Sequence, residues 1–449
     1  PAMRAVDRLV PLYAAQPVAA YLDTAQLIEA AHSSGADAVH PGYGFVSENA
    51  AFARAVSEAG LRFIGPSPEV MELMGDKIAS RNFVAEAGFP VAPSTTREEE
   101  PASFATRAEG LGFPLVLKAS AGGGGKGMHI VHSAAELAAA AERASSEAER
   151  YFADGRIYAE RYIERPRHIE VQVLSDSRGN HIHLFERECS IQRRFQKIIE
   201  ESPSPALDDE LRQRICEAAV GIARAAKYEN AGTVEFILAP DGAFYFLEMN
   251  TRLQVEHPVT EEITGLDLVE LQVRIASGEA LPIRQGDVEI SGHAIECRIY
   301  AEDPDDNFAP ATGRVVDWVE PGSARFDSGI ALGSEVTPDF DPMLAKLVTR
   351  GSDRAAAVEA AVSALGELAI LGVTTNAPYL ARILEHDAFR RGETHTGFVS
   401  LYREALAAGP LGDARRRAVL AAAALANRDF CERVEAVPEP YASMGAFRN

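Results

Sequence analysis

The chain has 449 residues, more than a single hydrophobic core usually holds, which predicts about two to four domains. Its formal net charge of −22 argues against nucleic acid and anionic membranes as partners, but not against a local basic pocket for a small anion. No apolar run reaches transmembrane length, and no signal peptide opens the sequence. Four cysteines without a C-x-x-C spacing indicate a reduced, cytoplasmic protein rather than a disulfide framework or a zinc site.

Residues 24 to 64 alternate between helical and strand patterns. Helices are predicted for "TAQLIEAAHSS" (24–34) and "SENAAFARAVSEA" (47–59), each followed by a glycine. Strands are predicted for "ADAVH" (36–40) and "LRFIG" (61–65). Helix and strand alternating at this spacing are typical of a parallel α/β sheet.

The rest of the chain divides into three further regions. A helical stretch runs to about residue 87, and strand patterns dominate residues 164 to 280, with one helix at about 207–228. "GEALPIRQGD" (278–287) is a plausible domain boundary. The predicted division is an N-terminal α/β domain (1–72), a central domain (73–280) that includes a smaller unit at about 91–163, a C-terminal α+β domain (292–400), and a helical tail with a linker (406–449).

Four consecutive glycines interrupt the segment "LKASAGGGGKGM" (117–128). The letters fit a dinucleotide-binding pattern and partly fit a Walker A loop, but Lys126 is followed by glycine instead of Ser or Thr. Both motifs need a helix directly after the loop, whereas a strand pattern follows here and the helix begins only at the capping box Ser133-x-x-Glu136. The glycines are therefore predicted to join two strands in a hairpin that covers phosphates as a lid. The alternative is a mobile surface turn without a ligand.

Polar residues alternate with mostly apolar ones along "FLEMNTRLQVEH" (246–257). The polar set is Glu248, Asn250, Arg252, Gln254 and Glu256. If the segment is a strand, all five share one face. A turn at "PDG" (240–242) would pair it with the strand that carries Glu235, so that Glu235 faces Glu248. Such oxygen ligands suit Mg²⁺ beside ATP phosphates, whereas the alternative is an amphipathic strand with its polar side in water.

Four basic positions stand out in this acidic chain. Lys77, the segment "SIQRRFQK" (190–197) and Lys118 supply local positive charge, and Lys118 closes an apolar strand directly at the glycine loop. Arg298 lies within the apolar strand "AIECRIYA", where an unpaired charge would be unfavourable. Most exposed lysines are merely solvated, so Lys118 and Arg298 are the stronger candidates for binding an anion.

Together these segments resemble one family, the biotin carboxylase subunit or domain of biotin-dependent carboxylases. The matching segments, between about residues 20 and 400, are "HPGYGFVSEN", "FIGP…LMGDK", "LKASAGGGGKGM", "RHIEVQVL", "ECSIQRRFQK", "FLEMNTRLQVEHPVTE", "HAIECRIYAEDP" and "DPMLAKL". The resemblance implies an ATP-grasp fold of α/β and α+β domains. Its parts are an N-terminal α/β (pre-ATP-grasp) domain, a mobile lid, a central ATP-grasp body and a C-terminal domain.

The resemblance also implies roles for individual residues. The implied nucleotide contacts are Lys77, Lys118, Gly123, Gly124, Gly125, Glu160, Arg161, Tyr162, Ile163, His168, Gln192, Glu235 and Glu248. The implied Mg²⁺ or Mn²⁺ ligands are Glu235, Glu248 and Asn250. The implied bicarbonate site is Lys197, Arg252, Gln254, Val255 and Glu256. Within these sets, Glu256 matches the general base and Arg252 the catalytic arginine, while Arg298 matches the residue that holds carboxyphosphate and biotin.

The implied reaction is the ATP- and bicarbonate-dependent carboxylation of biotin N1′ through carboxyphosphate. Carboxyphosphate is unstable in water, which explains the need for a glycine lid that shuts before it forms. The implied partners are a biotin carboxyl carrier protein and a carboxyltransferase, which selects the final acceptor. No Ala-Met-Lys-Met biotinylation sequence occurs, so the biotin is expected to come from outside this sequence.

Two further features depart from the family pattern. The sequence begins after the first strand and helix of the N-terminal domain, so that domain is expected to be truncated with an exposed sheet edge. This weakens the expectation of a homodimer. Phe195 stands where many members have a histidine that contacts the nucleotide, and this is expected to alter affinity more than chemistry.

Two other functions remain open from the sequence alone. One is another ATP-grasp ligase of the carbamoyl-phosphate synthetase type, which uses the same carboxyphosphate step. The other is an inactive, truncated subunit that binds nucleotide without catalysis. Bicarbonate-dependent ATPase activity that rises with free biotin distinguishes the leading hypothesis from both.

Overall fold

The computed structural model describes residues 6–96, 101–120 and 128–409. The predicted phosphate contacts Gly123, Gly124 and Gly125 and nearly all of the predicted helical tail lie outside these described residues.

The N-terminal segment has the predicted alternation of helices and strands. It consists of α1 (Pro17–Ala20), α2 (Thr24–Ser34), β1 (Ala38–Val39), α3 (Ala50–Glu58) and β2 (Arg62–Phe63). The strands β1 and β2 are parallel, with Ala38 opposite Arg62, as expected for an α/β unit. Gly35 ends α2 at a φ of 75°, a conformation that glycine adopts without strain.

The helical stretch predicted after residue 68 is broken into two helices, α4 (Pro68–Gly75) and α5 (Lys77–Glu86). Asp76 breaks it because its backbone is extended and its side chain caps the second helix. The carboxylate oxygen Oδ1 of Asp76 accepts hydrogen bonds from the N–H groups of Ile78 and Ala79, each at 2.9 Å. Lys77 therefore stands in the first turn of α5.

The segment around the glycine run forms a small unit, here called the lid. Its strands are β3 (Leu115–Ala119), β4 (His129–Val131) and β5 (Ile157–Arg161), in the antiparallel order β4-β3-β5, and its helices are α6 (Pro101–Gly110) and α7 (Ala134–Phe152). Leu115, Leu117 and Val131 form a core of their own with α7. The prediction that the glycines join two strands is therefore confirmed. The predicted capping box does not form, because Glu136 accepts from the N–H of His132 rather than from that of Ser133, and Ser133 makes no capping bond.

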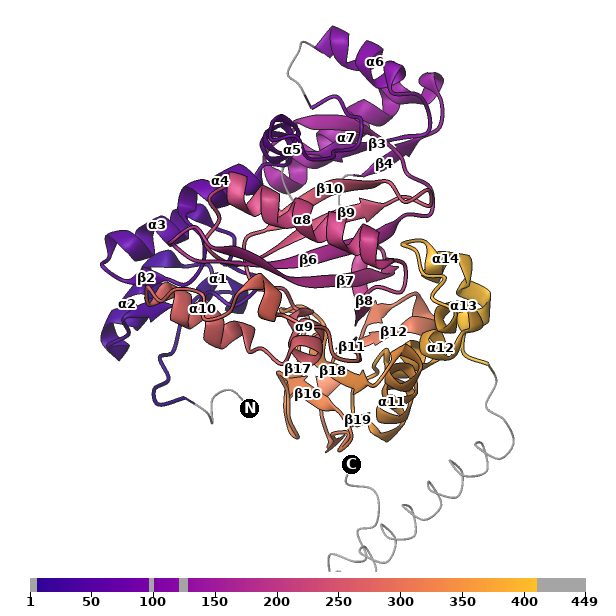
Figure 1. Cartoon of the computed structure of the whole chain (residues 1–449). Helices are drawn as coiled ribbons and strands as arrows, with labels where there is room; N and C mark the ends of the chain where they lie inside the picture. The colour runs from indigo at the N-terminus through magenta and orange to yellow at the C-terminus, as the bar shows by residue number, and fades with distance from the viewer. Residues whose placement is uncertain (1–5, 97–100, 121–127, 410–449) are drawn as a thin grey trace, which may run out of the picture. The chain divides into compact units, whose positions relative to one another are not determined.

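An eight-stranded antiparallel sheet forms the body of the molecule (Figure 1). In spatial order its strands are β10 (Phe244–Asn250), β9 (Asn230–Leu238), β6 (Arg167–Ser175), β7 (His181–Arg193), β8 (Gln196–Ser202), β11 (His293–Tyr300), β18 (Met343–Gly351) and β16 (Arg325–Ser328). The pairing of β8 with β11 carries the sheet across the predicted boundary at 278–287. The central and C-terminal regions thus share one sheet.

Helices cover both faces of this sheet. The helix α8 (Asp209–Ala225) packs with α4 and α5 against one face of β6, β9 and β10. The helices α9 (His257–Thr264) and α10 (Leu268–Ala276) pack on the opposite face, while α11 (Arg354–Glu367) and α12 (Ala377–Glu385) cover the β11 end. Among the described residues, no helix has the length and apolar character needed to cross a membrane.

Short elements complete the described chain. They are η2 (Gln285–Asp287), β12 (Glu302–Asp303), η3 (Pro304–Asp306), β13 (Ala309–Pro310), β14 (Gly313–Arg314), β15 (Asp317–Val319), β17 (Glu335–Val336), β19 (Ala369–Leu371), α13 (Asp387–Arg390), α14 (Phe398–Leu401) and α15 (Arg403–Leu406).

Strand alternation divides the sheet into an apolar face and a polar face. On β6, Ile169 and Val171 belong to the core under α8, whereas the alternate residues His168, Glu170 and Gln172 are buried polar groups on the other face. Because a period of two separates these sets, one strand supplies both the core and the floor of a polar cavity.

Candidate active site

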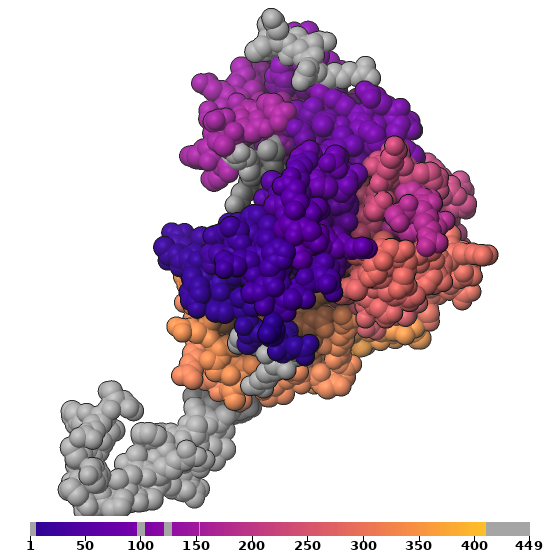
Figure 2. All heavy atoms as spheres, turned by 90° about the vertical axis from the view of Figure 1, so that its left-hand side faces the viewer, coloured from indigo at the N-terminus to yellow at the C-terminus, as the bar shows by residue number. Residues whose placement is uncertain are grey.

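A cavity of about 1020 Å³ opens between the lid, the polar face of the sheet and the N-terminal segment. In Figure 2 the N-terminal segment (indigo) lies between the lid above (violet to magenta) and the C-terminal strands below (orange). Every described residue predicted for the site lines this cavity: Lys77, Lys118, Glu160, Arg161, Tyr162, Ile163, His168, Gln192, Lys197, Glu235, Glu248, Asn250, Arg252, Gln254, Val255, Glu256 and Arg298. The structure thus brings together residues from the lid strands, the large sheet, the helix α5 and the loops between them.

The strands β9 and β10 form the predicted hairpin, and Glu248 lies directly opposite Glu235. A β-bulge at Leu247 shifts the register between Phe246 and Glu248. The extra residue reverses the alternation, so that Phe246 and Met249 both enter the core while Glu248 faces the cavity. Leu247 lines the cavity as well, contrary to its predicted place on the apolar face.

The prediction of one strand from 246 to 257 is wrong beyond Asn250. Strand β10 ends there, and Arg252, Gln254 and Glu256 reach the cavity from an irregular segment that leads into α9. Pro258 lies in the first turn of α9, where its fixed φ and missing N–H favour the start of a helix and disfavour a continuing strand. The polar side chains still converge, but through a turn rather than through strict alternation.

At the lid end of the cavity, single ion pairs hold the lysines. Nζ of Lys118 lies 3.0 Å from Oε2 of Glu160, and Nζ of Lys77 lies 3.0 Å from Oε2 of Glu248. Burial lowers the pKa of Lys118 although Glu160 opposes this. Burial acts in the same direction on Lys77, but the nearby carboxylates, Glu248 first, outweigh it and raise the pKa of that lysine. Both cations stand where anionic phosphates would compete for them.

At the opposite end, Lys197 and Glu256 form the centre of a buried charge cluster. Nζ of Lys197 donates to Glu170, to Glu235 at 2.8 Å and to Glu256 at 2.7 Å. Although burial opposes ionisation of Glu256, the charges of Lys197 and Arg298 outweigh it and hold the pKa of Glu256 well below its usual range. Glu256 is therefore a carboxylate at neutral pH and is able to accept a proton.

Arg298 bridges two carboxylates at this same end. Its Nη2 donates to Oε2 of Glu256 at 2.9 Å, and its Nε donates to Oε1 of Glu200 at 2.6 Å. The sequence places Arg298 within an apolar strand, where an unpaired charge would be unfavourable. In the structure this charge is paired, with Glu200 on β8 and with Glu256 before α9.

The remaining predicted residues lie between the two ends. Nε2 of His168 lies 3.0 Å from Oε2 of Glu235, and the side-chain amide of Gln192 lies 3.2 Å from Nδ1 of His168. Gln254 donates to Glu235 at 3.0 Å. Phe195 occupies the turn between β7 and β8 at a φ of 67° and lines the cavity with its side chain half exposed.

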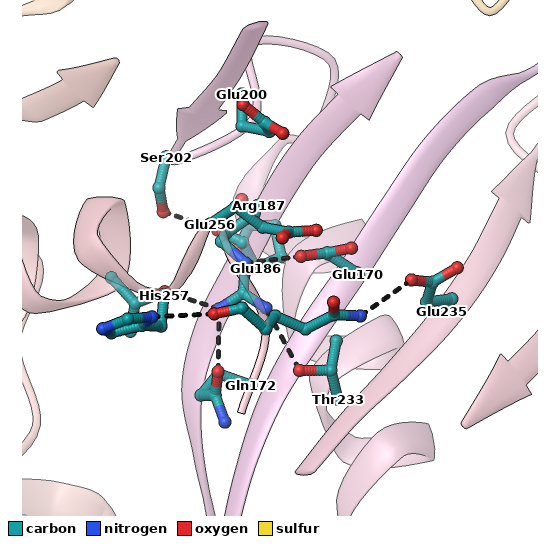
Figure 3. Close-up of polar contacts among 12 residues, drawn as sticks. Glu170, Gln172, Glu186, Arg187, Glu200, Ser202, Thr233, Glu235, Glu256 and His257 are labelled. Atoms are coloured by element: carbon teal, nitrogen blue, oxygen red, sulfur yellow. Dashed lines mark hydrogen bonds and ion pairs between the residues drawn. The ribbon is translucent and has the colours of Figure 1, made fainter. Parts of the chain in front are cut away.

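Sequence reasoning missed the buried residues that hold Glu170, one of the carboxylates around Lys197. Glu170 accepts from Nε of the fully buried Arg187, whose other nitrogens donate to Gln172 and Thr233 (Figure 3). For Glu170 and Gln172 the signal was the polar alternation within "RHIEVQVL", which has the same period as the segment around Glu248.

The predicted metal ligands offer a chemically suitable donor set. Glu235 and Glu248 present carboxylates across the hairpin, and Asn250 donates to Glu235 at 2.9 Å, which brings its amide beside them. Carboxylate and amide oxygens suit a hard divalent cation such as Mg²⁺. Among the described residues, His168, Glu170 and Glu235 form a further close group, but Arg187 and Lys197 already hold Glu170.

The fold and cavity are those of an ATP-grasp protein, and comparison with known proteins extends this assignment. Three family models match in chain order. They are the biotin carboxylase N-terminal domain (residues 1–71), the carbamoyl-phosphate synthase L chain ATP-binding domain (residues 76–284) and the biotin carboxylase C-terminal domain (residues 296–401).

Curated relatives and solved structures agree with these models. A pyruvate carboxylase subunit of Methanothermobacter thermautotrophicus is 50% identical over 87% of this chain and 80% of its own length. Biotin carboxylase of Halalkalibacterium halodurans is 49% identical over 86% of each chain. The biotin carboxylase domain dimer of Hydrogenobacter thermophilus 2-oxoglutarate carboxylase, solved with MgADP, ADP and bicarbonate, has a TM-score of 0.86 and 43% identity over 89% of this chain and 88% of that one.

The chain belongs to the biotin carboxylase family, whose members are ATP-dependent ligases that carboxylate biotin.

Proposed function

We propose that this cavity performs the complete first half-reaction of a biotin-dependent carboxylase, using the residues described above. The observation that carries the proposal is the continuity of one cavity. It joins the facing carboxylates Glu235 and Glu248 to the cluster of Lys197, Glu256 and Arg298. Phosphoryl transfer to bicarbonate needs these two sets within reach of one another.

In the proposed ATP site, Lys77 and Lys118 exchange their carboxylate partners for phosphate oxygens. The base and ribose lie against Glu160 to Ile163, His168 and Gln192, where Phe195 offers an aromatic contact. Glu235, Glu248 and Asn250 hold Mg²⁺, or Mn²⁺, which when bound neutralises phosphate charge and orients the γ-phosphate. The predicted contacts Gly123, Gly124 and Gly125 complete this proposal from outside the described residues.

Bicarbonate is proposed to bind between Lys197, Arg252, Gln254 and Val255. Glu256 takes the proton from its hydroxyl group, and the resulting oxyanion forms a bond to the γ-phosphorus of ATP as the bond to the ADP oxygen breaks. Lys197 and Arg298 stabilise the charge that this step brings into the site. The ionised state of Glu256 supports its role as the base.

The product, carboxyphosphate, is proposed to break into CO₂ and phosphate beside Arg298. The phosphate takes the proton from biotin N1′, and the guanidinium of Arg298 stabilises the enolate that forms on the ureido oxygen. The N1′ atom then forms a bond to CO₂. In this proposal Arg298 contributes a fixed charge and Arg252 orients the reacting oxygens.

The biotin is proposed to arrive on a carboxyl carrier protein, and a carboxyltransferase subunit then uses the carboxyl group. Relatives named as subunits of larger carboxylases support this, and a related domain was solved as a dimer, which favours a homodimer here. A cytoplasmic location and the domain division given above belong to the same proposal.

The test is ATP hydrolysis by the purified chain with Mg²⁺. We expect hydrolysis that requires bicarbonate and rises with free biotin, together with carboxybiotin formation from labelled bicarbonate. Stimulation by ammonia or glutamine instead would favour a carbamoyl-phosphate type of ligase. ATP binding without either activity would favour a nucleotide-binding subunit and contradict the proposal.

A further inference from the structure

Behind Arg298, two buried glutamates are incompletely paired. Glu296 on β11 is fully buried, and neither of its carboxylate oxygens has a hydrogen-bond partner among the described residues. Glu200 on β8 is also fully buried, and only its Oε1 is bonded, to Nε of Arg298. Burying an ionised carboxylate without a partner is strongly unfavourable, so this arrangement favours the protonated form of one of these glutamates.

The two glutamates are cross-strand neighbours. Glu296 lies directly opposite Glu200 in the antiparallel ladder between β11 and β8. Side chains at such opposed positions share one face of the sheet and stand close together. Two negative charges there repel one another, which favours binding of one proton by the pair.

The surrounding charges do not neutralise Glu296 directly. The ionisable groups that interact with the pair are Lys197 on β8, Arg298 and Tyr300 on β11, Lys346 on β18, Cys189 on β7 and Glu256 at the start of α9. Lys346 donates to the backbone oxygen of Val255 at 2.8 Å, and Arg298 donates to Glu200 and Glu256. On the other face of β11, Ile295 and Cys297 belong to the apolar core under α11 and α12.

The electrostatic environment agrees with this geometry. Burial raises the pKa of Glu200 to about 7, against the opposing charge of Arg298. Burial likewise raises the pKa of Glu296 well above its usual range, and Lys346 only partly offsets it. Both groups thus favour a proton at a pH where ordinary glutamates are ionised.

We propose that Glu200 and Glu296 share one proton at neutral pH and act as a positioning pair for Arg298. The anionic member binds Nε and so aims the terminal nitrogens of the guanidinium at Glu256 and the cavity. The protonated member keeps a second negative charge away from the back of Arg298. Loss of the shared proton would weaken the attraction of this end of the cavity for an anionic reactant.

The proton itself is tested without any assay of activity. When folding raises the pKa of a glutamate, the folded state keeps the proton to a higher pH than the unfolded state does. The contribution of that glutamate to the stability of the folded state therefore falls as the pH rises. A glutamine at 296 cannot ionise, so E296Q is expected to melt at a higher temperature than wild type at about pH 8.5, with the gain shrinking towards about pH 5. Infrared difference spectra of wild type minus E296Q should contain a protonated carboxyl band at neutral pH.

The matched control is E201Q. Glu201 neighbours Glu200 and is also buried, but it is ionised and paired, with Arg354 at 2.6 and 3.0 Å and His293 at 2.8 Å. The same substitution should therefore lower the melting temperature there. If E296Q is destabilised to the same extent at every pH, and the carboxyl band is missing, the shared proton does not exist.

The effect on Arg298 depends on the proposed function and needs a kinetic test. We expect the KM for bicarbonate of the wild type to rise about threefold to tenfold between about pH 7 and pH 9, because the pair loses its proton. E296Q should remove this rise, while the KM for ATP stays unchanged in both proteins. Identical bicarbonate profiles for wild type and E296Q would refute the positioning role. If no bicarbonate-dependent activity is found, the proposed function is refuted. The melting and infrared results would then still decide whether the two glutamates hold a proton.

Discussion

The two ends of the cavity hold their charges in different ways. At the lid end, Lys118 and Lys77 each rely on one close carboxylate, and Lys118 belongs to a small sheet with its own core. At the opposite end, Lys197 contacts three carboxylates and Arg298 contacts two, all on or beside the large sheet.

This difference suggests that the two ends of the cavity have different roles. A lysine held by one carboxylate can exchange that partner for a phosphate oxygen, which suits a nucleotide that binds and leaves. A buried network fixed by several strands is rigid, which suits proton transfer and charge stabilisation. Substitutions at the two ends test this contrast.

The largest effect is expected for Glu256→Gln. Without a carboxylate to accept the bicarbonate proton, carboxybiotin formation should fall about 10²- to 10⁴-fold, while the KM for ATP changes little. The matched control is Glu262→Gln, within the helix α9 that follows. Turnover at the wild-type rate in E256Q would remove Glu256 from its role as base.

Lys197→Met should damage both activity and stability. Three buried carboxylates would lose their shared cation, at a cost of about 3–5 kcal/mol in the free energy of unfolding. Lys197 lowers the pKa of Glu235 and of Glu256, so the loss should be greatest near neutral pH and smaller in acid, where these two glutamates take up protons. Urea unfolding at several pH values measures this, and a loss that does not vary with pH would contradict the network.

Lys118→Met should act mainly on nucleotide affinity. Removing one charge-assisted contact is expected to raise the KM for ATP about tenfold, with a smaller change in kcat. Stability should change little, because Arg81 stays 3.4 Å from Glu160. Lys227→Met, at an exposed lysine after α8, serves as the control. An unchanged KM for ATP in K118M would place the phosphates elsewhere.

The smallest effect is expected for Arg156→Ala. Arg156 links the lid to Asp76 at 3.0 Å, but its side chain is 58% exposed, so the pair is worth at most about 1 kcal/mol. The KM for ATP should therefore shift less than about threefold. A tenfold shift would show that this surface pair controls the lid, and that the lid end is more tightly organised than its ion pairs suggest.

Local sequence patterns predicted much of the fold. Helix and strand periodicity predicted α2 and α3, and the strands on either side of the glycine run. The turn at 240–242 correctly predicted that Glu235 faces Glu248, because a short hairpin fixes its own register. The break at Asp76 and the end of β10 at Asn250 were missed, since capping and a proline decide such boundaries against the periodicity.

The sequence by itself determined which residue types are available and, through its periodicity and its resemblance to a family, which of them belong to the cavity. Only the tertiary structure decided which charges meet. Lys197 finds its three carboxylates 27, 38 and 59 residues away, and no local pattern specifies that convergence. That Glu296 has no hydrogen-bond partner among the described residues is decided in the same way, because the energy of a buried charge depends on all its neighbours in space.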